Sequence, residues 1–169
     1  SAGAASSPLG NLLCDVMRNA TGAQLAFHNR TGIRADLPPG PQRVRDMYKV
    51  SPFSNTLVTM TMSGADVLAL LDHAVSSGTR LFLEVSGMTA GYDGAAPEGQ
   101  RVRDVAIGGA PLDPQGRYLV VTNSFLAKGG DGHVAFTRGA EAKDTGINLL
   151  EAQIDWFRAH SPVAPNPEP

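Results

Sequence analysis

The sequence predicts an α+β fold, a layered α/β domain with a mixed or antiparallel sheet, from three observations. Apolar and polar residues alternate over Thr56–Met62, which indicates a strand with one buried face. Apolar residues recur every three or four positions after Gly10 and after Ser63, which indicates amphipathic helices. The predicted strands come in pairs with helices between them, an order too irregular for a doubly wound parallel sheet.

The N-terminal third is predicted to hold one helix and one strand. The helix runs from about Gly10 to Ala20 and ends at Thr21-Gly22. One of its faces is apolar and carries Leu13, Val16, Met17 and Ala20. A short apolar run, Gln24 to Phe27, indicates a buried strand that leads into a polar loop from Asn29 to Arg34. The prolines that follow, at positions 38, 39 and 41, break the chain again.

The centre of the chain is predicted to form a strand and then a helix. Val58, Met60 and Met62 face one side of the strand, and the threonines between them face the other. Ser63 caps the following helix, with Asp66 at its third position. The helix ends at Gly78, and its apolar stripe consists of Val67, Leu70, Leu71 and Ala74.

Three further strands and a last helix complete the prediction. The strands are Leu81–Val85, Val102–Ile107 and Tyr118–Thr122, and Gly108-Gly109 fits a hairpin turn between two of them. The last helix starts near Ile147, with Ile147, Leu150, Ile154 and Phe157 on one side.

The length of 169 residues suits one domain, predicted over residues 9–160. Residues 1–8 are small and polar, so we expect a flexible segment there. Residues 161–169 are rich in proline and are expected to form an extended tail or linker. An apolar content of 42% with 18% charged residues is typical of a soluble globular chain.

Charge and hydropathy exclude two classes of partner. The formal net charge is -2 without a run of either sign, which argues against a protein that binds duplex nucleic acid. No stretch of the sequence approaches the length of a membrane span, and no signal peptide is predicted. The single cysteine, Cys14, is expected to be a buried thiol.

The sequence contains no motif for a metal or for a catalytic residue. The four histidines, His28, His73, His133 and His160, do not pair at ligand spacing. A Walker loop and the Gly-x-Ser-x-Gly motif of serine hydrolases are also absent. We therefore expect no metal, no cofactor and no catalytic residue in this chain.

Two loops have an unusual composition. Ser51–Asn55 places Phe53 in a turn just before a strand. Asn123–Gly132 follows a strand and holds Phe125 and then Asp131 among three glycines. Glycines let a backbone approach a ligand closely, and a carboxylate there can accept hydrogen bonds from a vicinal diol. The residues alone also allow another interpretation, an ordinary loop in which Phe125 is in the core and Asp131 caps a turn.

Four motifs in order resemble a known family. They are Gly10-Asn11-Leu12-Leu13-Cys14-Asp15-Val16-Met17, Asn29-x-x-Gly32-Ile33-Arg34, Pro52-Phe53-x-Asn55-Thr56-Leu57 and Asn123-x-Phe125-Leu126-Ala127-x-Gly129-Gly130-Asp131-Gly132. Together they look like the C-terminal domain of the 5'-nucleotidases, a family that includes UDP-sugar hydrolases and ecto-5'-nucleotidases. The similarity covers about residues 9–160.

The resemblance implies a role for each residue of a substrate site. Phe53 and Phe125 are expected to sandwich a base, and Asp131, beside Gly130, to take the ribose hydroxyls. Asn29 and Asn55 are expected to contact base or sugar, and Arg34 to reach towards phosphate or ribose.

Two departures from the family pattern concern the phosphate end. The motif of the family is usually Asn-x-Gly-Gly-Ile-Arg, but in this sequence Thr31 replaces the first of those glycines. If that position requires a positive φ, a β-branched residue there is costly and moves Arg34. The family also commonly has an arginine before the Gly-Asn-Leu motif, whereas no basic residue precedes Arg18 in this chain.

The resemblance implies a substrate-binding domain of a two-domain, metal-dependent 5'-nucleotidase. An N-terminal metallophosphoesterase domain, outside this chain, would hold two divalent metals and the catalytic groups, so the chain alone would bind nucleotides or nucleosides without hydrolysing them. The resemblance also implies a periplasmic or cell-surface location. Two alternatives remain: a free-standing, non-catalytic nucleotide-binding module, or the same domain from a cyclic nucleotide phosphodiesterase or a thiosulfohydrolase.

Overall fold

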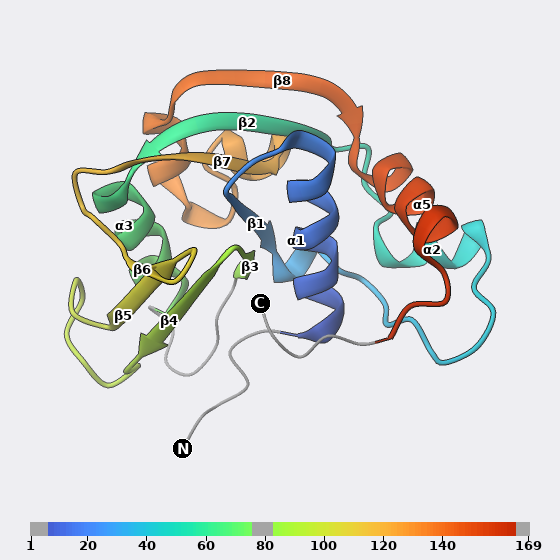
Figure 1. Ribbon diagram of the computed structural model, residues 1–169, viewed down its shortest axis with the longest axis horizontal. Helices are drawn as coiled ribbons and strands as arrows, with labels where there is room; N and C mark the ends of the chain where they lie inside the picture. Colours follow the sequence, from blue (N-terminus) through green and yellow to red (C-terminus); the bar gives the residue numbers. More distant parts are fainter. Residues whose placement is uncertain (1–6, 76–82, 165–169) are drawn as a thin grey trace.

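A five-stranded mixed sheet is the centre of the computed structural model, which describes residues 7–75 and 83–164 (Figure 1). The strand order is β3-β1-β7-β2-β8. β1 runs parallel to β7, and the other neighbouring pairs are antiparallel. This confirms the predicted layered α+β fold with a mixed sheet. The strands are β1 (Leu25–Asn29), β2 (Thr56–Ser63), β3 (Leu83–Ser86), β7 (Arg117–Asn123) and β8 (Ala140–Asn148).

Successive side chains of a strand point to opposite sides, so the central strands contribute to two core clusters, one on each face of the sheet. One core cluster contains Phe27, Val58 and Met60 together with the apolar stripe of α3 (Gly64–Ala74). The other contains Ala26, Leu57 and Val121 together with side chains of α1 (Pro8–Thr21) and α5 (Leu149–His160). The domain therefore has three layers, with α1 and α5 on one face of the sheet and α3 on the other.

The predicted helix boundaries are explained by their caps. The Ser7 hydroxyl accepts a hydrogen bond from the Gly10 amide at the start of α1, and Gly22, at a φ of 70°, ends that helix. The Ser63 hydroxyl accepts from the Asp66 amide at the start of α3, as the sequence predicts. The apolar face of α1 is buried except for Ala20, which is exposed. The predicted end of α3 at Gly78 lies outside the described residues.

A small second sheet consists of β4 (Met88–Tyr92), β5 (Val102–Ile107) and β6 (Ala110–Pro111). Gly108 and Gly109 form the turn between β5 and β6, with φ values of 58° and 83° that suit a tight hairpin. The predicted turn is therefore present, but it joins β5 to a two-residue strand and not to the strand that begins near Tyr118.

Several elements were not predicted. They are α2 (Val44–Val50), α4 (Ser124–Ala127), the 3-10 turns η1 (Arg30–Gly32), η2 (Gly130–Gly132) and η3 (Val134–Arg138), and the strands β4, β6 and β8. The predicted start of the last helix at Ile147 is wrong by two residues: Ile147 lies in β8, where its side chain is exposed. In the described part of the chain, no helix is long and apolar enough to cross a membrane.

Candidate functional site

The candidate site lies where three loops meet at one edge of the central sheet. β1 and β7 are parallel, so their carboxyl ends, Asn29 and Asn123, lie at the same edge. β2 is antiparallel to β7, and its pairing of Leu57 with Asn123 puts the start of β2 at that edge too. The segment before β2 and the segments after β1 and β7 therefore converge, and they carry every site residue predicted from the sequence.

The loop after β7 presents Phe125 to solvent because Asn123 begins a short helix there. The Asn123 Oδ1 atom accepts a hydrogen bond from the Leu126 amide at 2.9 Å, which caps α4. The Leu126 side chain enters the core, whereas 44% of Phe125 is exposed. The alternative interpretation of an ordinary loop with Phe125 in the core is therefore wrong.

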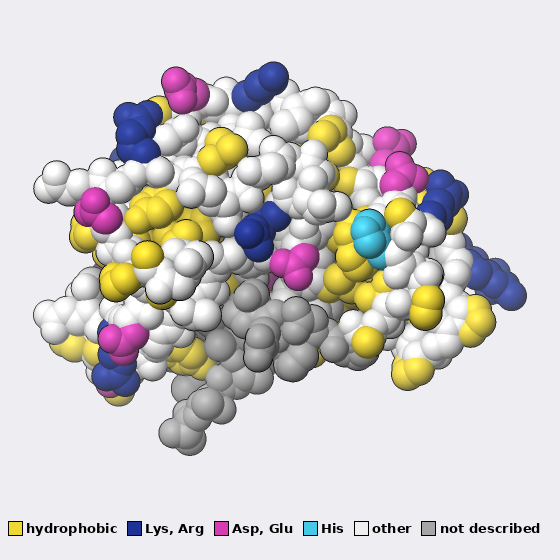
Figure 2. All heavy atoms as spheres, viewed as in Figure 1, with side chains coloured by type: hydrophobic (Ala, Val, Ile, Leu, Met, Phe, Trp, Pro, Cys, Tyr) yellow, Lys and Arg dark blue, Asp and Glu magenta, His cyan; other side chains and the backbone are white. Residues whose placement is uncertain are grey.

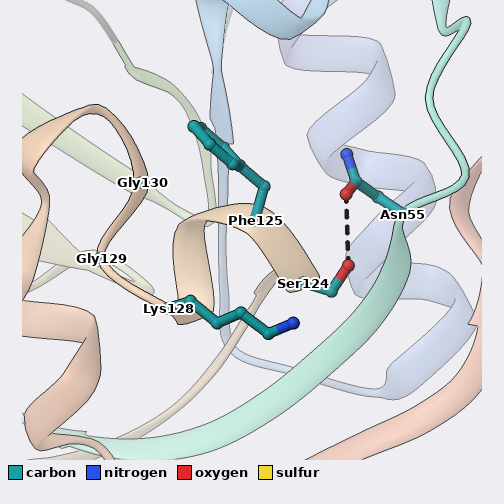
Figure 3. A pocket seen from close by; sticks show the side chains of 6 residues that line it. All are labelled: Asn55, Ser124, Phe125, Lys128, Gly129 and Gly130. Carbon is teal, nitrogen blue, oxygen red and sulfur yellow. Dashed lines mark hydrogen bonds between the residues drawn. The ribbon is translucent and has the colours of Figure 1, made fainter.

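Ser124 joins this helix to the loop before β2. Its hydroxyl donates to Asn55 Oδ1 and accepts from the Thr56 amide, both at 3.2 Å. The first of these bonds is drawn in Figure 3. Phe53 lies on the same loop, two residues before Asn55, and 47% of it is exposed. Two exposed aromatic rings are thereby held on loops that are tied together.

A pocket of about 400 Å³ opens beside α4 (Figure 3). Phe125 and Lys128 leave the helix on different sides, and the Lys128 ammonium extends towards the Ser124–Asn55 bond (Figure 3). The Phe125 ring packs against Gly130 so closely that a Cβ at that position would collide with it. Three residues predicted from the sequence line the pocket: Asn55, Phe125 and Gly130. Ser124, Lys128 and Gly129 complete the lining.

Asp131 has an unusual backbone conformation in the glycine-rich loop. Its φ of 54° and ψ of 23° lie in the left-handed region, and the flanking Gly129 and Gly132 also have positive φ. Its Oδ2 atom accepts hydrogen bonds from the Thr31 hydroxyl at 2.8 Å and from Asn29 Nδ2 at 3.3 Å. The carboxylate is thereby fixed at the surface, where a ligand can reach it.

The backbone at Thr31 differs from what the sequence led us to expect. It lies in η1 and is not one of the three non-glycine residues with positive φ in the described part of the chain. The strain expected from a β-branched residue is therefore absent. Its hydroxyl instead links two predicted site residues, because it accepts from Asn29 Nδ2 at 2.8 Å and donates to Asp131.

The remaining two predicted residues lie under and beside Asp131. Asn29 is buried, and its Oδ1 accepts from Asn123 Nδ2 at 2.9 Å while its Nδ2 donates to Thr31 and Asp131. Arg34 is exposed, and its Nη1 donates to the Thr31 carbonyl at 3.2 Å. A direct contact of these two residues with a ligand stays a prediction, as it does for the other five predicted site residues.

Two histidines lie next to the Asp131 loop, the buried His133 and the exposed His73. His73 Nε2 lies 3.3 Å from the Asp131 carbonyl oxygen, and the His73 and His133 rings meet edge to face with centroids 4.8 Å apart. Burial, and secondly the neighbouring His73, lowers the pKa of His133 from 6.5 to about 4. His133 is therefore neutral at pH 7. Among the described residues, no group of three or more His, Cys, Asp or Glu could hold a metal ion.

A second hollow, of about 1060 Å³, lies apart from this site. It separates the start of α1 from the loop before α2 and the end of α5, and its lining is mainly apolar. Figure 2 shows apolar side chains gathering on this part of the surface. None of the residues predicted for the site lines it.

Comparisons with known proteins agree on one family. The family described as "5'-nucleotidase, C-terminal domain" matches residues 1–138. The chain is 32% identical over 157 residues to an apyrase of Tabanus yao, with 85% of this chain and 28% of the apyrase covered. It is 34% identical over 146 residues to cell wall protein Lmo0130 of Listeria monocytogenes, with 78% of this chain and 19% of that protein covered.

A solved structure gives the same result in three dimensions. The 5'-nucleotidase precursor from Thermus thermophilus superimposes with a TM-score of 0.88 at 39% identity, over 95% of this chain and 34% of that one. The chain thus spans about a third or less of the length of these similar proteins.

Proposed function

Since this chain belongs to the family of 5'-nucleotidase C-terminal domains, we propose that it binds the nucleoside part of a nucleotide at the edge where the three loops meet. The observation that carries the proposal is the pair of exposed rings, Phe53 and Phe125, on loops joined through Ser124. Exposed aromatic side chains suit stacking on a planar base, and Phe125 also lines the pocket beside α4.

Each part of the site has a role in this proposal. Phe53 and Phe125 stack on the base, and Asn55 contacts its edge from the pocket wall. Asp131 accepts hydrogen bonds from the ribose hydroxyls. Arg34 and Lys128 are the nearby cations, and Arg34 is the one we assign to the phosphate side.

Stacking can supply enough free energy for a weak complex. A base stacked on an aromatic side chain gains about 1–3 kcal/mol, and a millimolar complex requires about 4 kcal/mol. Two rings and one carboxylate are therefore sufficient for millimolar or somewhat tighter binding. Stacking also tolerates different bases, which suits a domain that serves several nucleotides.

The chemical step belongs to another part of the whole protein in this proposal. Hydrolysis of a phosphate monoester commonly uses two metal ions, which we assign to an N-terminal metallophosphoesterase domain. This chain supplies nucleotide recognition to that domain, in a periplasmic or cell-surface protein. The similarity to a protein described as a cell wall protein supports such a location.

Alanine substitution of the two rings tests the proposal. We expect Phe53→Ala or Phe125→Ala to weaken adenosine binding at least about fivefold, because each removes about 1 kcal/mol or more of stacking. Isothermal titration calorimetry measures the affinity. Phe157→Ala, in the separate apolar hollow, is the matched control and should leave the affinity unchanged. Unchanged affinity in the Phe53 and Phe125 variants would remove the base sandwich from the account.

A further inference from the structure

A chain of hydrogen bonds runs from the core of the domain to the carboxylate of Asp131. It begins at Asn123, which is fully buried, and passes through the buried amide of Asn29. It then passes through the Thr31 hydroxyl, which is at the surface, and ends on Asp131 Oδ2. These hydrogen bonds connect residues about 100 positions apart in the sequence, and they join the ends of β1 and β7 to the glycine-rich loop.

In this series of hydrogen bonds, each donor lies on the side of the core and each acceptor on the side of Asp131. Asn123 Nδ2 donates to Asn29 Oδ1, Asn29 Nδ2 donates to Thr31 Oγ1, and the Thr31 hydroxyl therefore has its proton free to donate to Asp131. Hydrogen bonds of one direction polarise one another, and the last one has a carboxylate as its acceptor. The Thr31–Asp131 bond, at 2.8 Å, is shorter than the 3.3 Å between Asn29 Nδ2 and the same oxygen.

The two carboxylate oxygens of Asp131 are consequently different. Oδ2 accepts two hydrogen bonds, from Thr31 and Asn29. Oδ1 has no donor among the residues that the structure describes. Because Asp131 is exposed, Oδ1 is the oxygen that a ligand can reach without breaking a protein contact.

The backbone around Asp131 makes this restraint necessary. Gly129, Gly130 and Gly132 flank the residue, and glycine has more backbone freedom than any other residue. A carboxylate on such a loop would sample several orientations if nothing held it. Thr31 is itself exposed and lies in a short 3-10 turn, so its hydroxyl contributes a directed contact to Asp131 more than any packing in the core.

We propose that Thr31 is a positioning residue for the sugar subsite: its hydroxyl holds Asp131 Oδ2, so that Oδ1 alone receives the hydroxyl groups of a ribose. The inference rests on the proposed function, in which Asp131 faces the ribose. The Thr31 side chain thus connects the carboxylate to the buried amide of Asn29.

The test compares two ligands and four forms of the protein. Adenosine carries both ribose hydroxyls, and 2',3'-dideoxyadenosine carries neither. The forms are the wild type, Thr31→Val, which is isosteric but has no hydroxyl, Thr31→Ser, which keeps the hydroxyl, and Asp131→Asn. Calorimetry gives the affinity of each form for each ligand.

We expect Thr31→Val to weaken adenosine binding about three- to tenfold, because Asp131 keeps only the longer hydrogen bond from Asn29 and its carboxylate is held less firmly. Its affinity for dideoxyadenosine should not change, since that ligand makes no contact with Asp131. Thr31→Ser should restore adenosine binding to within about twofold of the wild type. An equal loss of affinity for both ligands would show a merely structural role for Thr31. Unchanged affinity for both would show that the Thr31–Asp131 hydrogen bond does not contribute to binding. Either result overturns the inference.

A measurement without ligand separates this inference from the proposed function. Three-bond couplings between the α and β protons of Asp131 report its side-chain rotamers. We expect one rotamer in the wild type and in Thr31→Ser, and averaged couplings in Thr31→Val. If wild type and Asp131→Asn prefer adenosine over dideoxyadenosine equally, the ribose role of Asp131 fails even where the couplings behave as expected. Unchanged couplings in Thr31→Val overturn the positioning role itself.

Discussion

At the scale of single residues, His133 has the most unfavourable environment among the polar side chains near the site. Only 1% of it is exposed, and neither ring nitrogen has a hydrogen-bond partner within the described part of the chain. A buried polar group without a partner destabilises the folded state. In the neutral form this cost is tolerable, whereas a charged imidazolium in the same place is not, which is why its pKa falls to about 4.

His133 therefore makes stability depend on pH in a definite direction. The unfolded chain binds a proton at this residue below about pH 6.5, and the folded protein does so only near pH 4. Folding stability should thus be complete above pH 6.5 and fall as the pH drops towards 4, by at most about 3 kcal/mol from this group. Urea unfolding at pH 7, 6 and 5 measures this loss.

The variant His133→Phe keeps a ring in this position but cannot take up a proton. It should show a smaller loss of unfolding free energy between pH 7 and pH 5 than the wild type. Part of the loss should remain, because burial also lowers the pKa of His28. Identical losses in the two proteins would mean that His133 is not the group that titrates.

At the scale of secondary structure, the elements that the sequence predicted correctly are those with a regular apolar pattern. β2 alternates with a period of two, and α3 has both a cap and a stripe, so local rules determine them. β8 has no such pattern: Ile147 is its only large apolar residue, and most of the strand is exposed at the edge of the sheet. Only its pairing with β2, about 80 residues away, makes it a strand.

The candidate site divides in the same way. Phe53, Asn55, Phe125, Gly130 and Asp131 belong to recognisable motifs, and the structure places them on loops that meet at one edge. The contact between Thr31 and Asp131 has no local signal, because it depends on the parallel pairing of β1 and β7. A sequence pattern can indicate where the glycines are, but not which hydroxyl lies 2.8 Å from a carboxylate.

Two helix caps allow a test at this scale. Asn123 caps α4 and also supports Asn29, whereas Ser63 caps α3 at the opposite end of β2 from the site. We expect Asn123→Ala to destabilise the fold by about 2 kcal/mol or more and to weaken adenosine binding, because it removes a cap and a buried hydrogen bond. Ser63→Ala should lower stability by about 1 kcal/mol and leave binding unchanged. Urea unfolding and calorimetry on both variants make the comparison, and equal effects on binding would contradict the link from Asn123 to the site.

At the scale of the whole molecule, the mixed sheet explains why one edge carries the site. The parallel pair, β1 and β7, brings two carboxyl-terminal loops together, and the antiparallel β2 delivers a third. Two helices pack on one face of the sheet and one on the other, and the exposed side chains of Phe53, Phe125 and Asp131 show that the edge itself is open. The apolar hollow between α1, α5 and the loop before α2 is a separate surface. The central claim is that nucleosides bind at the sheet edge and not in that hollow.

Chemical-shift mapping of the 169-residue protein during an adenosine titration tests this claim most directly. We expect saturable shifts for the amides around Phe53, Asn55, Phe125 and Asp131, and none for those around Phe157. Ring currents of the base would make the shifts near the two phenylalanines the largest. Saturable shifts that cluster instead in the apolar hollow, or the absence of saturable shifts at millimolar adenosine, would contradict the account.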